Sequence, residues 1–341
     1  MPAERAESPA MTPVAPSPSK TGIVIIGRNE GARLVRCLDS LRGLHADCVY
    51  VDSGSTDESI AAACSRGVAV VELDLAMPFT AARARNAGAA WLLATRPEIT
   101  RLQFFDGDCE VAAGWVDSAG SFLDARPDVG VVYGIQKERH PERSVYNLLF
   151  DIEWDTPRGA VASSTGNCCV RRELFEALQG FREDLIAGED PEFCLRVRRS
   201  GYLVWHLDVP MVLHDAEMMH FSQWWRRAKR AGYAFAEGAF LHGRSPEQHF
   251  VRERRSILVW GLLLPAILLA AAVLLSPWAL VGLLVYPLQV WRIGRRGSRG
   301  PRLDRLYALF VVVAKFPEAL GLLRFERDRI ARAPRRLIEY K

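Results

Sequence analysis

The sequence lacks the patterns of several common protein classes. Its 7 cysteines include no CxxC pair, and the closest two, Cys168 and Cys169, are adjacent. An odd number of cysteines without metal-binding spacing is typical of free thiols in a reducing compartment. The formal net charge is only +4 over 341 residues. This balance argues against a nucleic-acid-binding protein, which concentrates far more positive charge.

Two nucleotide-binding fingerprints are also absent. A dinucleotide-binding oxidoreductase carries GxGxxG after its first strand, but the chain has GRNEG at 27–31, and it has no P-loop. The first 20 residues are rich in Pro, Ala and Ser and contain no apolar core. We therefore expect a disordered tail at 1–20, no signal peptide, and a first domain on the cytoplasmic side of the membrane.

What the sequence does contain is an alternation of apolar strand-like runs and amphipathic helices. The pattern predicts one α/β domain over residues 21–250, with a mostly parallel sheet flanked by helices. In the first expected helix, Leu34 and Leu38 share one face. Ser55 and Glu58 are spaced as a capping box for the second. The expected strands are 22–27, 48–52, 68–73, 101–106 and 129–134, and the expected helices are 29–41, 55–67, 79–95 and 114–125.

Two of the expected strands end in carboxylates. Asp52 ends the second strand, and Asp106 and Asp108 end the fourth. Parallel strands present their carboxyl ends along one edge of a sheet, where ligands bind, so these side chains should line one crevice. Divalent cations such as Mg²⁺ take carboxylate oxygens and substrate phosphates as ligands. The alternative is that DGD at 106–108 is an ordinary turn.

The last ninety residues differ in kind from the rest. The run at 256–275 is uncharged and about long enough to cross a bilayer. A shorter run at 277–291 has tryptophans near both ends, as at membrane interfaces. Basic clusters at 252–255 and 292–302 flank the pair, which predicts a hairpin with both ends in the cytoplasm.

A third apolar stretch, 303–323, carries charged residues, so we expect an interfacial helix there. Residues 251–341 are thus interpreted as a membrane-associated region. This interpretation predicts a protein of the inner (plasma) membrane with a cytoplasmic catalytic domain. The alternative is a soluble helical cap.

At this point the residues resemble a known family. The motifs run in the order seen in family 2 glycosyltransferases of the GT-A fold, over residues 21–233. This resemblance implies a Rossmann-like sheet, a nucleoside-diphosphate sugar donor, a divalent cation (Mg or Mn) and inversion of the anomeric centre. The motifs are VIIGRNE (24–30), VDSGSTDES (51–59), ARNAGAA (84–90), FFDGDCE (104–110), TGNCCVRRELFEALQGF (165–181) and GEDPEFCLRVRRSGY (188–202).

The resemblance also implies roles for single residues. Asp190 is similar to the family's catalytic base, and Asp108 and Asp106 resemble its metal-binding DxD pair, with His214 as a further candidate ligand. The run QWWRR at 223–227 loosely resembles the family's QxxRW element. The residues implied to contact the nucleotide sugar are Glu30, Asp52, Arg85 and Asp106, and those on the acceptor or diphosphate side are Glu189, Trp225 and Arg226.

Each role has a structural alternative. Asp190 precedes Pro191 and could be a helix N-cap, and Asp52 could cap a turn with Ser55. Arg85 could be a surface charge, and His214 could be structural. The aromatic pair Trp224 and Trp225 could pack the domain against the membrane segments.

We therefore interpret the chain as an inverting, membrane-anchored glycosyltransferase. It would move a sugar from a nucleoside-diphosphate sugar, with a UDP-sugar expected, to a hydroxyl of a lipid-linked or envelope glycan acceptor, as in exopolysaccharide assembly. Its partners would be the donor, the acceptor and the membrane, with no nucleic acid. One alternative is a polyprenyl-phosphate glycosyltransferase, and another is a catalytically degenerate membrane scaffold. A nucleotidyltransferase would need a Gly-rich basic loop after the first strand, which GRNEGAR at 27–33 matches poorly.

Overall fold

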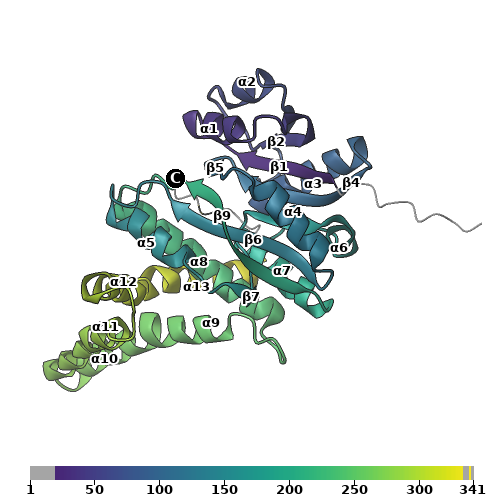
Figure 1. Cartoon of the computed structure of the whole chain (residues 1–341). Coiled ribbons are helices and arrows are strands. Elements are labelled where there is room, and N and C mark those ends of the chain that lie inside the picture. The colour runs from purple at the N-terminus through teal and green to yellow at the C-terminus, as the bar shows by residue number, and fades with distance from the viewer. Residues whose placement is uncertain (1–19, 333–337, 339–341) are drawn as a thin grey trace, which may run out of the picture.

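The computed structural model of the chain describes residues 20–332 and residue 338 (Figure 1). The predicted tail at 1–20 lies outside the described residues except for Lys20, which already belongs to the first strand.

A mixed sheet of nine strands forms the centre of the described chain. The strands are β1 (Lys20–Gly27), β2 (Cys48–Asp52), β3 (Ala69–Glu72), β4 (Ile99–Asp106), β5 (Cys109–Val111), β6 (Val129–Glu138), β7 (Gly159–Val161), β8 (Cys168–Arg171) and β9 (Leu203–His214). Their order is β3-β2-β1-β4-β8-β6-β9-β5, and β7 pairs with β9. The first four run parallel, whereas β8 is antiparallel to both β4 and β6. The predicted α/β fold with helices on a mostly parallel sheet is confirmed.

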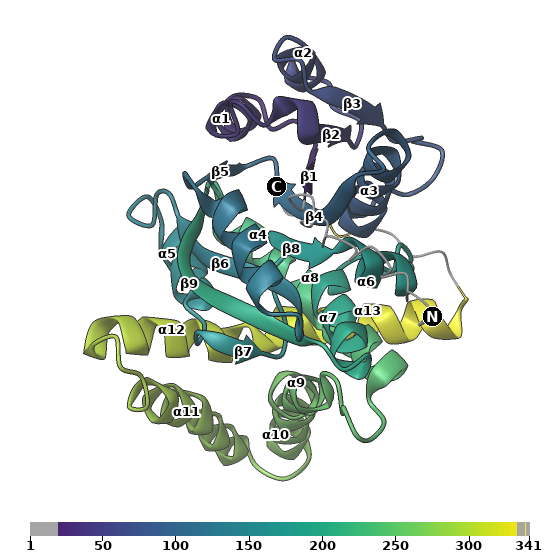
Figure 2. The same ribbon diagram turned by 45° about the vertical axis from the view of Figure 1, so that its right-hand side comes forward.

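Eight helices of the first 250 residues surround this sheet (Figure 2). They are α1 (Ala32–Ser40), α2 (Ser59–Cys64), α3 (Ala81–Thr95), α4 (Trp115–Ala125), α5 (Val145–Trp154), α6 (Arg172–Ala177), α7 (Glu189–Arg199) and α8 (Phe221–His242). The expected apolar face of α1 is confirmed, since Leu34 and Leu38 are fully buried. The capping box expected at Ser55 is wrong: α2 begins at Ser59 without a side-chain cap, because the Ser55 hydroxyl donates to Asp52 instead.

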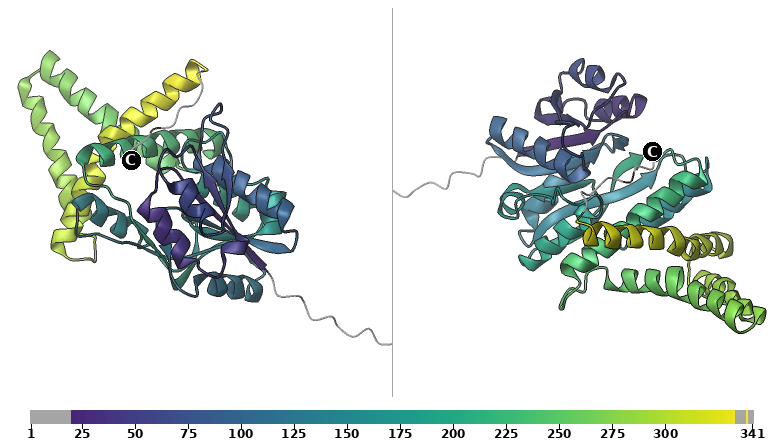
Figure 3. Two further views of the ribbon diagram at one scale, coloured as in Figure 1. Left: turned by 90° about the horizontal axis from the view of Figure 1, so that it is seen from above. Right: turned by 180° about the vertical axis from the view of Figure 1, so that it is seen from behind.

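The described part of the C-terminal region consists of helices joined by short turns. Its helices are α9 (Val251–Ile257), the π-helical η2 (Leu258–Leu263), α10 (Leu264–Leu274), the 3₁₀ segment η3 (Pro277–Leu284), α11 (Val285–Gly294), α12 (Pro301–Val313) and α13 (Lys315–Ile330). The first three form one continuous helix. Figures 1 and 3 show α10 and α11 extending away from the sheet, while α12 and α13 run between them and the rest of the molecule.

Two of these helices are long and apolar enough to cross a bilayer by length and composition alone. They are 251–274 and 301–330, and the most apolar stretch of each is 11% and 44% buried, respectively. The expected second leg at 277–291 is helical, but it divides into η3 and α11. The two apolar helices indicate membrane association only weakly, and the second has a large protein-facing side.

That protein-facing side belongs to α13, which packs closely on α8. A Cβ atom added at Gly321 would lie 1.9 Å from the carbonyl oxygen of Lys229, and one at Gly232 would lie 2.0 Å from that of Glu318. Only glycine allows two helix backbones to approach this closely. The C-terminal region therefore packs on the α/β part through close contact between the backbones of α13 and α8.

Candidate active site

Asp52 lies at the carboxyl end of β2, as predicted, and it organises the turn that follows. Its Oδ2 accepts hydrogen bonds from the backbone N–H groups of Gly54 (2.9 Å) and Ser55 (2.7 Å), and its Oδ1 accepts one from the Tyr50 hydroxyl at 3.0 Å. The side chain is buried. The turn-capping interpretation of Asp52 is thus confirmed, and its proposed contact with a nucleoside remains a prediction.

Arg85 of α3 bonds to three carboxylates, one at the end of β4 and two in the first turn of α7. Its Nη2 donates to Asp106 Oδ1 at 2.9 Å, and its Nη1 donates to Glu189 Oε1 at 2.8 Å and to Asp190 Oδ1 at 3.4 Å. Only 3% of the Arg85 side chain is exposed, so the surface-charge alternative is wrong. A guanidinium with several donors in a fixed fork suits such a shared position. Arg85 therefore fixes the spacing between the end of β4 and the start of α7.

Asp190 lies in the first turn of α7, and 21% of its side chain is exposed. Gly188 is the N-cap of this helix, so the alternative that Asp190 itself caps the helix is wrong. Desolvation and, after it, the charge of Glu189 raise the pKa of Asp190 to about 7, against the opposing charge of Arg85. A carboxylate that titrates near neutral pH is suited to accept a proton from a hydroxyl group.

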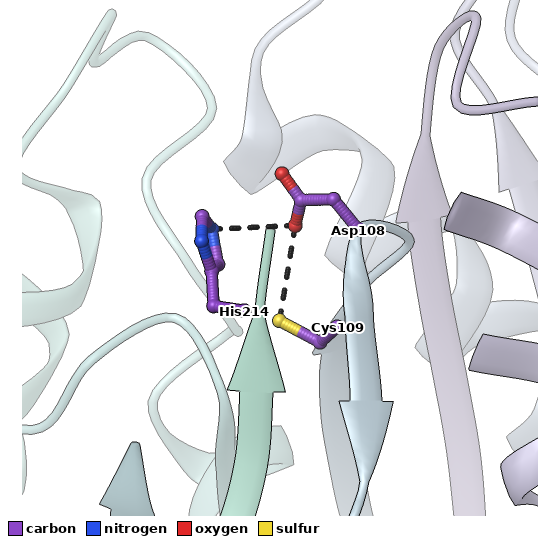
Figure 4. A group of neighbouring side chains, drawn as sticks. All are labelled: Asp108, Cys109 and His214. Carbon is purple, nitrogen blue, oxygen red and sulfur yellow. Dashed lines mark hydrogen bonds and ion pairs between the residues drawn. The ribbon is translucent and has the colours of Figure 1, made fainter. Parts of the chain in front are cut away.

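Asp108 points away from Asp106, toward the end of β9. There β5 and β9 pair antiparallel, which sets Cys109 opposite His214 (Figure 4). Oδ1 of Asp108 lies 3.3 Å from Nε2 of His214 and 3.7 Å from Sγ of Cys109. On the other side of the ring, Nδ1 of His214 lies 3.7 Å from Oε2 of Glu138. All four residues are buried.

These side chains fit a divalent cation. The ligand atoms of Asp108, Cys109 and His214 lie within 4.8 Å of one another. A carboxylate oxygen and an imidazole nitrogen are common donors to divalent metals. Glu138 behind the ring supplies the carboxylate that usually orients a metal-binding histidine. Asp106 is engaged by Arg85, which leaves Asp108 and His214 as the stronger candidates for direct ligands.

Two cavities meet beside Asp106. The β1 cavity, of about 640 Å³, is lined by Glu30, Phe79 and other residues beyond the end of β1. The α8 cavity, of about 700 Å³, lies between α8, α7 and α12, and Asp190 faces it. Asp106 and Arg230 line both. In the β1 cavity the guanidinium of Arg28 lies over the Phe79 ring, 4.7 Å from its centroid.

Comparison with models of protein families assigns the chain to a family. The profile of Glycosyl transferase family 2 matches residues 22–179, and that of Glycosyl transferase family group 2 matches residues 138–314, more than half of the chain. The chain is a family 2 glycosyltransferase. The resemblance of the motifs is thereby confirmed.

Known proteins similar to this glycosyltransferase are distant. The pre-mycofactocin glycosyltransferase of Mycobacterium tuberculosis is 28% identical over 222 residues, which cover 60% of this chain and 44% of that relative. The chain thus spans less than half the length of that relative.

Solved structures show the likeness of fold. The mannosyltransferase PcManGT from Pyrobaculum calidifontis, in complex with GDP-Man and Mn²⁺, is 20% identical with a TM-score of 0.55, covering 93% of this chain and 90% of that one. Residues 1–349 of S. aureus TarS are 15% identical with a TM-score of 0.50, covering 92% of both chains.

The residues of the QWWRR run at 223–227 lie in different environments. Trp224 is buried and packs against Phe310 of α12, with ring centroids 4.9 Å apart, so its packing alternative is confirmed. Trp225 and Arg226 were expected on the acceptor or diphosphate side. Among the described residues, neither lines the two cavities, and the exposed Arg226 donates to the carbonyl of Ser222 in its own helix. Consecutive residues of an α-helix point in different directions around its axis, so Trp225 and Arg226 do not share the cavity-facing side of α8 with Trp224.

Sequence reasoning missed three residues of this glycosyltransferase site. Arg230 lies three positions after Arg227 on the cavity-facing side of α8, and this helical spacing was available as a signal. Cys109 was visible only as a core thiol, and Glu138 lies at the end of a strand predicted to finish at 134. Their meeting with His214 depends on pairing between β5, β6 and β9, which no local pattern reveals.

Proposed function

We propose that this glycosyltransferase moves a sugar, with inversion, from a nucleoside-diphosphate sugar to a hydroxyl group of a lipid-linked or envelope glycan acceptor. The observation that carries the proposal is the meeting of two cavities at Asp106 and Arg230, with Asp190 on the α8 side of the junction. A donor in the β1 cavity and an acceptor in the α8 cavity would bring their reacting atoms together at that junction.

The β1 cavity suits the nucleotide half of a donor. Glu30 and the Arg28–Phe79 pair provide hydrogen-bonding and stacking groups at its far end, and Arg230 provides positive charge near Asp106. PcManGT, one of the similar structures, was solved with GDP-Man and Mn²⁺. By analogy, a UDP- or GDP-sugar would lie with its diphosphate toward the carboxylates of Asp106 and Asp108.

The chemistry follows from the groups at the junction. Asp190, as base, takes the proton of the acceptor hydroxyl while that oxygen bonds to the anomeric carbon from the face opposite the diphosphate. The bond from this carbon to the diphosphate oxygen breaks, and its electron pair leaves with the nucleoside diphosphate. A divalent cation (Mg or Mn) held by Asp108 and His214 would supply positive charge for the leaving group. Arg230 is suited to share that task.

The charge of the α8 cavity favours a neutral acceptor hydroxyl over a polyprenyl phosphate. Four basic and six acidic side chains line this cavity, so a phosphate-bearing head group would meet an acidic excess. Its apolar wall comes from Trp224 and from Phe310 and Val311 of α12. The charged residues are Arg85, Arg227, Arg230 and Lys315, against Asp106, Glu153, Glu189, Asp190, Glu253 and Glu318.

A location at the inner membrane is part of the proposal. Large apolar side chains of the α10–α11 region are exposed, including Ile267, Val273 and Trp278 at 62%, 84% and 80%. Such a patch on a soluble surface is unusual and marks a membrane or protein contact. The basic clusters at 252–255 and 292–302 favour a cytoplasmic catalytic domain. The membrane would then bring a lipid-linked acceptor to the α12 wall of the α8 cavity.

The deciding experiment measures hydrolysis and transfer by detergent-solubilised protein across a panel of nucleoside-diphosphate sugars, with Mg²⁺, with Mn²⁺ and with chelator. Wild type is compared with Asp108→Ala and Asp190→Asn. We expect turnover of one donor only with metal, and loss of turnover in both variants. Analysis of the product's anomeric configuration tests inversion.

A degenerate scaffold is the competing function. It predicts no donor turnover with any acceptor and no metal-dependent binding of UDP or GDP by wild type. That combined result would overturn the catalytic proposal. Nucleotide binding without hydrolysis would instead call for the same assay with membrane-extracted lipid acceptors, because an acceptor can be obligatory for turnover.

A further inference from the structure

The cluster at the end of β9 contains a sulfur atom that the proposed reaction does not use. Cys109 is fully buried, yet it faces polar groups and not the apolar core alone. Its Sγ lies 3.7 Å from Asp108 Oδ1, and it accepts a hydrogen bond from Asn167 Nδ2 at 3.5 Å. Asn167 in turn accepts a hydrogen bond from the backbone N–H of Asp106 through Oδ1 at 2.8 Å, so the same amide ties the thiol to the end of β4.

The separations of the donor atoms suit shared coordination of one ion. Oxygen and nitrogen ligands at about 2.0 Å and a sulfur at about 2.3 Å, arranged tetrahedrally, are roughly 3.3 Å (O to N) and 3.5 Å (O to S) apart. The corresponding distances here are 3.3 Å from Asp108 Oδ1 to His214 Nε2 and 3.7 Å from Asp108 Oδ1 to Cys109 Sγ. The Asp108 oxygen therefore already lies at near-coordinating spacing from both other donors, and all three donors lie within 4.8 Å of one another.

An independent observation points to a ligand at the same place. His214 is only 9% exposed, and its Nδ1 has no hydrogen-bond partner among the described residues, although Glu138 lies 3.7 Å away. Burying a polar nitrogen without a partner is unfavourable. A cation on Nε2 would make the Nδ1–H more acidic and draw it toward the Glu138 carboxylate, as in carboxylate–histidine–metal triads.

We propose that Cys109 is the third side-chain ligand of the cation, completing an oxygen, nitrogen and sulfur set with Asp108 and His214. The inference deepens the proposed metal-dependent transfer and rests on it. When the sulfur binds the ion, the thiol proton passes to the buffer. Thiolate and imidazole donors favour Co²⁺ and Zn²⁺ over Mg²⁺, which prefers oxygen ligands. The set therefore gives this transferase a preference for transition metals over magnesium.

The test uses Co²⁺, because cobalt bound to a thiolate gives a charge-transfer absorption band in the near ultraviolet. The full-length protein in detergent is freed of metal and titrated with Co²⁺ in the presence of UDP and, separately, of GDP. Calorimetry follows the binding alongside the spectrum. Wild type should give the band, and Cys109→Ser should lose it while still binding Co²⁺ through the other two ligands.

A matched control is available in Cys169, which is equally buried but lies on β8, where it pairs with Gln103 and Val132. Cys169→Ser should keep the band, and circular dichroism checks that all variants fold. We also expect the preference for Co²⁺ over Mg²⁺ to fall in Cys109→Ser.

Co²⁺ binding by wild type without the band, or a band that persists in Cys109→Ser, would overturn the sulfur ligand but leave the metal-dependent transferase standing. Absence of any metal binding by wild type with either nucleotide would overturn both proposals.

Discussion

The β1 cavity and the α8 cavity share two residues but are built in different ways. The β1 cavity takes part of its lining from the end of β1 and the loop after it, at 26–30, and the rest from Arg33, Phe79, Asp106 and the segment 217–230. The α8 cavity draws its walls from α3, α5, α7, α8, α9, α12 and the start of α13, across more than two hundred residues of sequence. The comparison teaches that the proposed donor site is complete within the α/β part of the chain, whereas the proposed acceptor site exists only once the C-terminal helices dock.

The ion pairs of Arg85 connect the two cavities at their junction. Arg85 joins a carboxylate of β4, on the side of the β1 cavity, to two carboxylates of α7, on the side of the α8 cavity. A buried arginine with such partners holds both halves in one geometry, because removing either side would leave buried charge uncompensated. Arg85 therefore couples the two cavities in the structure.

The largest effect is expected from Asp190→Asn, which leaves the shape of both cavities and removes the proposed base. General-base catalysis contributes roughly 10²–10⁴-fold in rate, so kcat should fall by about that factor while nucleotide affinity is kept. Asp117→Asn, the same change at an exposed position of α4 outside both cavities, is the control and should leave kcat nearly unchanged. Full activity of Asp190→Asn would remove the base from the proposal.

A glycine substitution separates the two cavities. Gly321→Ala forces a Cβ against the Lys229 carbonyl, and overpacking of this kind destabilises by about 1–3 kcal/mol. We expect a lower melting temperature and a larger loss of transfer than of UDP or GDP binding, because the start of α13 lines the α8 cavity and not the β1 cavity. Gly294→Ala on α11 is the control, since its Cβ would meet its nearest neighbour at an ordinary 3.4 Å. Equal loss of nucleotide binding and transfer would contradict the separation.

The pH dependence probes the junction itself. Because the pKa of Asp190 is raised to about 7, its ionised form is lost as the pH falls below that value, and the rate should drop about tenfold per pH unit there. Glu189→Gln removes a negative charge that raises this pKa, so the acidic limb of the rate profile should move to lower pH. A profile that stays in place in Glu189→Gln would show that another group titrates.

The smallest effect is expected from Arg226→Ala. This side chain is exposed and bonds only to its own helix in the described structure, so stability should change by less than about 0.5 kcal/mol and transfer should be unaffected. Its neighbour Arg227 lines the α8 cavity and pairs with Glu153 at 2.9 Å. Arg227→Ala should therefore raise the KM for the acceptor. A larger loss of transfer in Arg226→Ala than in Arg227→Ala would contradict this prediction and place Arg226 in the acceptor site.

Much of the first half of the fold was predictable from local pattern. The buried runs of β1, β2 and β4 and the apolar face of α1 follow hydrophobic periodicity, and Asp52 and Asp106 do end their strands. Asp108 was expected to end the fourth strand as well, but it lies in the turn between β4 and β5. Short strands were not predictable, because β5 and β7 have three residues each and exist through pairing with β9. The Ser55 capping box failed for a related reason, since Asp52 offered its hydroxyl a better partner.

The sequence by itself determined the family, the alternation of strands and helices, and the positions of the carboxylates at the strand ends, because these depend on side-chain type and on neighbours within a few residues. Only the tertiary structure decided what each carboxylate faces. Asp106 meets Arg85 and Asp108 meets His214, although the two are separated by a single glycine. A sheet edge directs such neighbours to different partners, and those partners arrive from strands and helices that are distant in the chain.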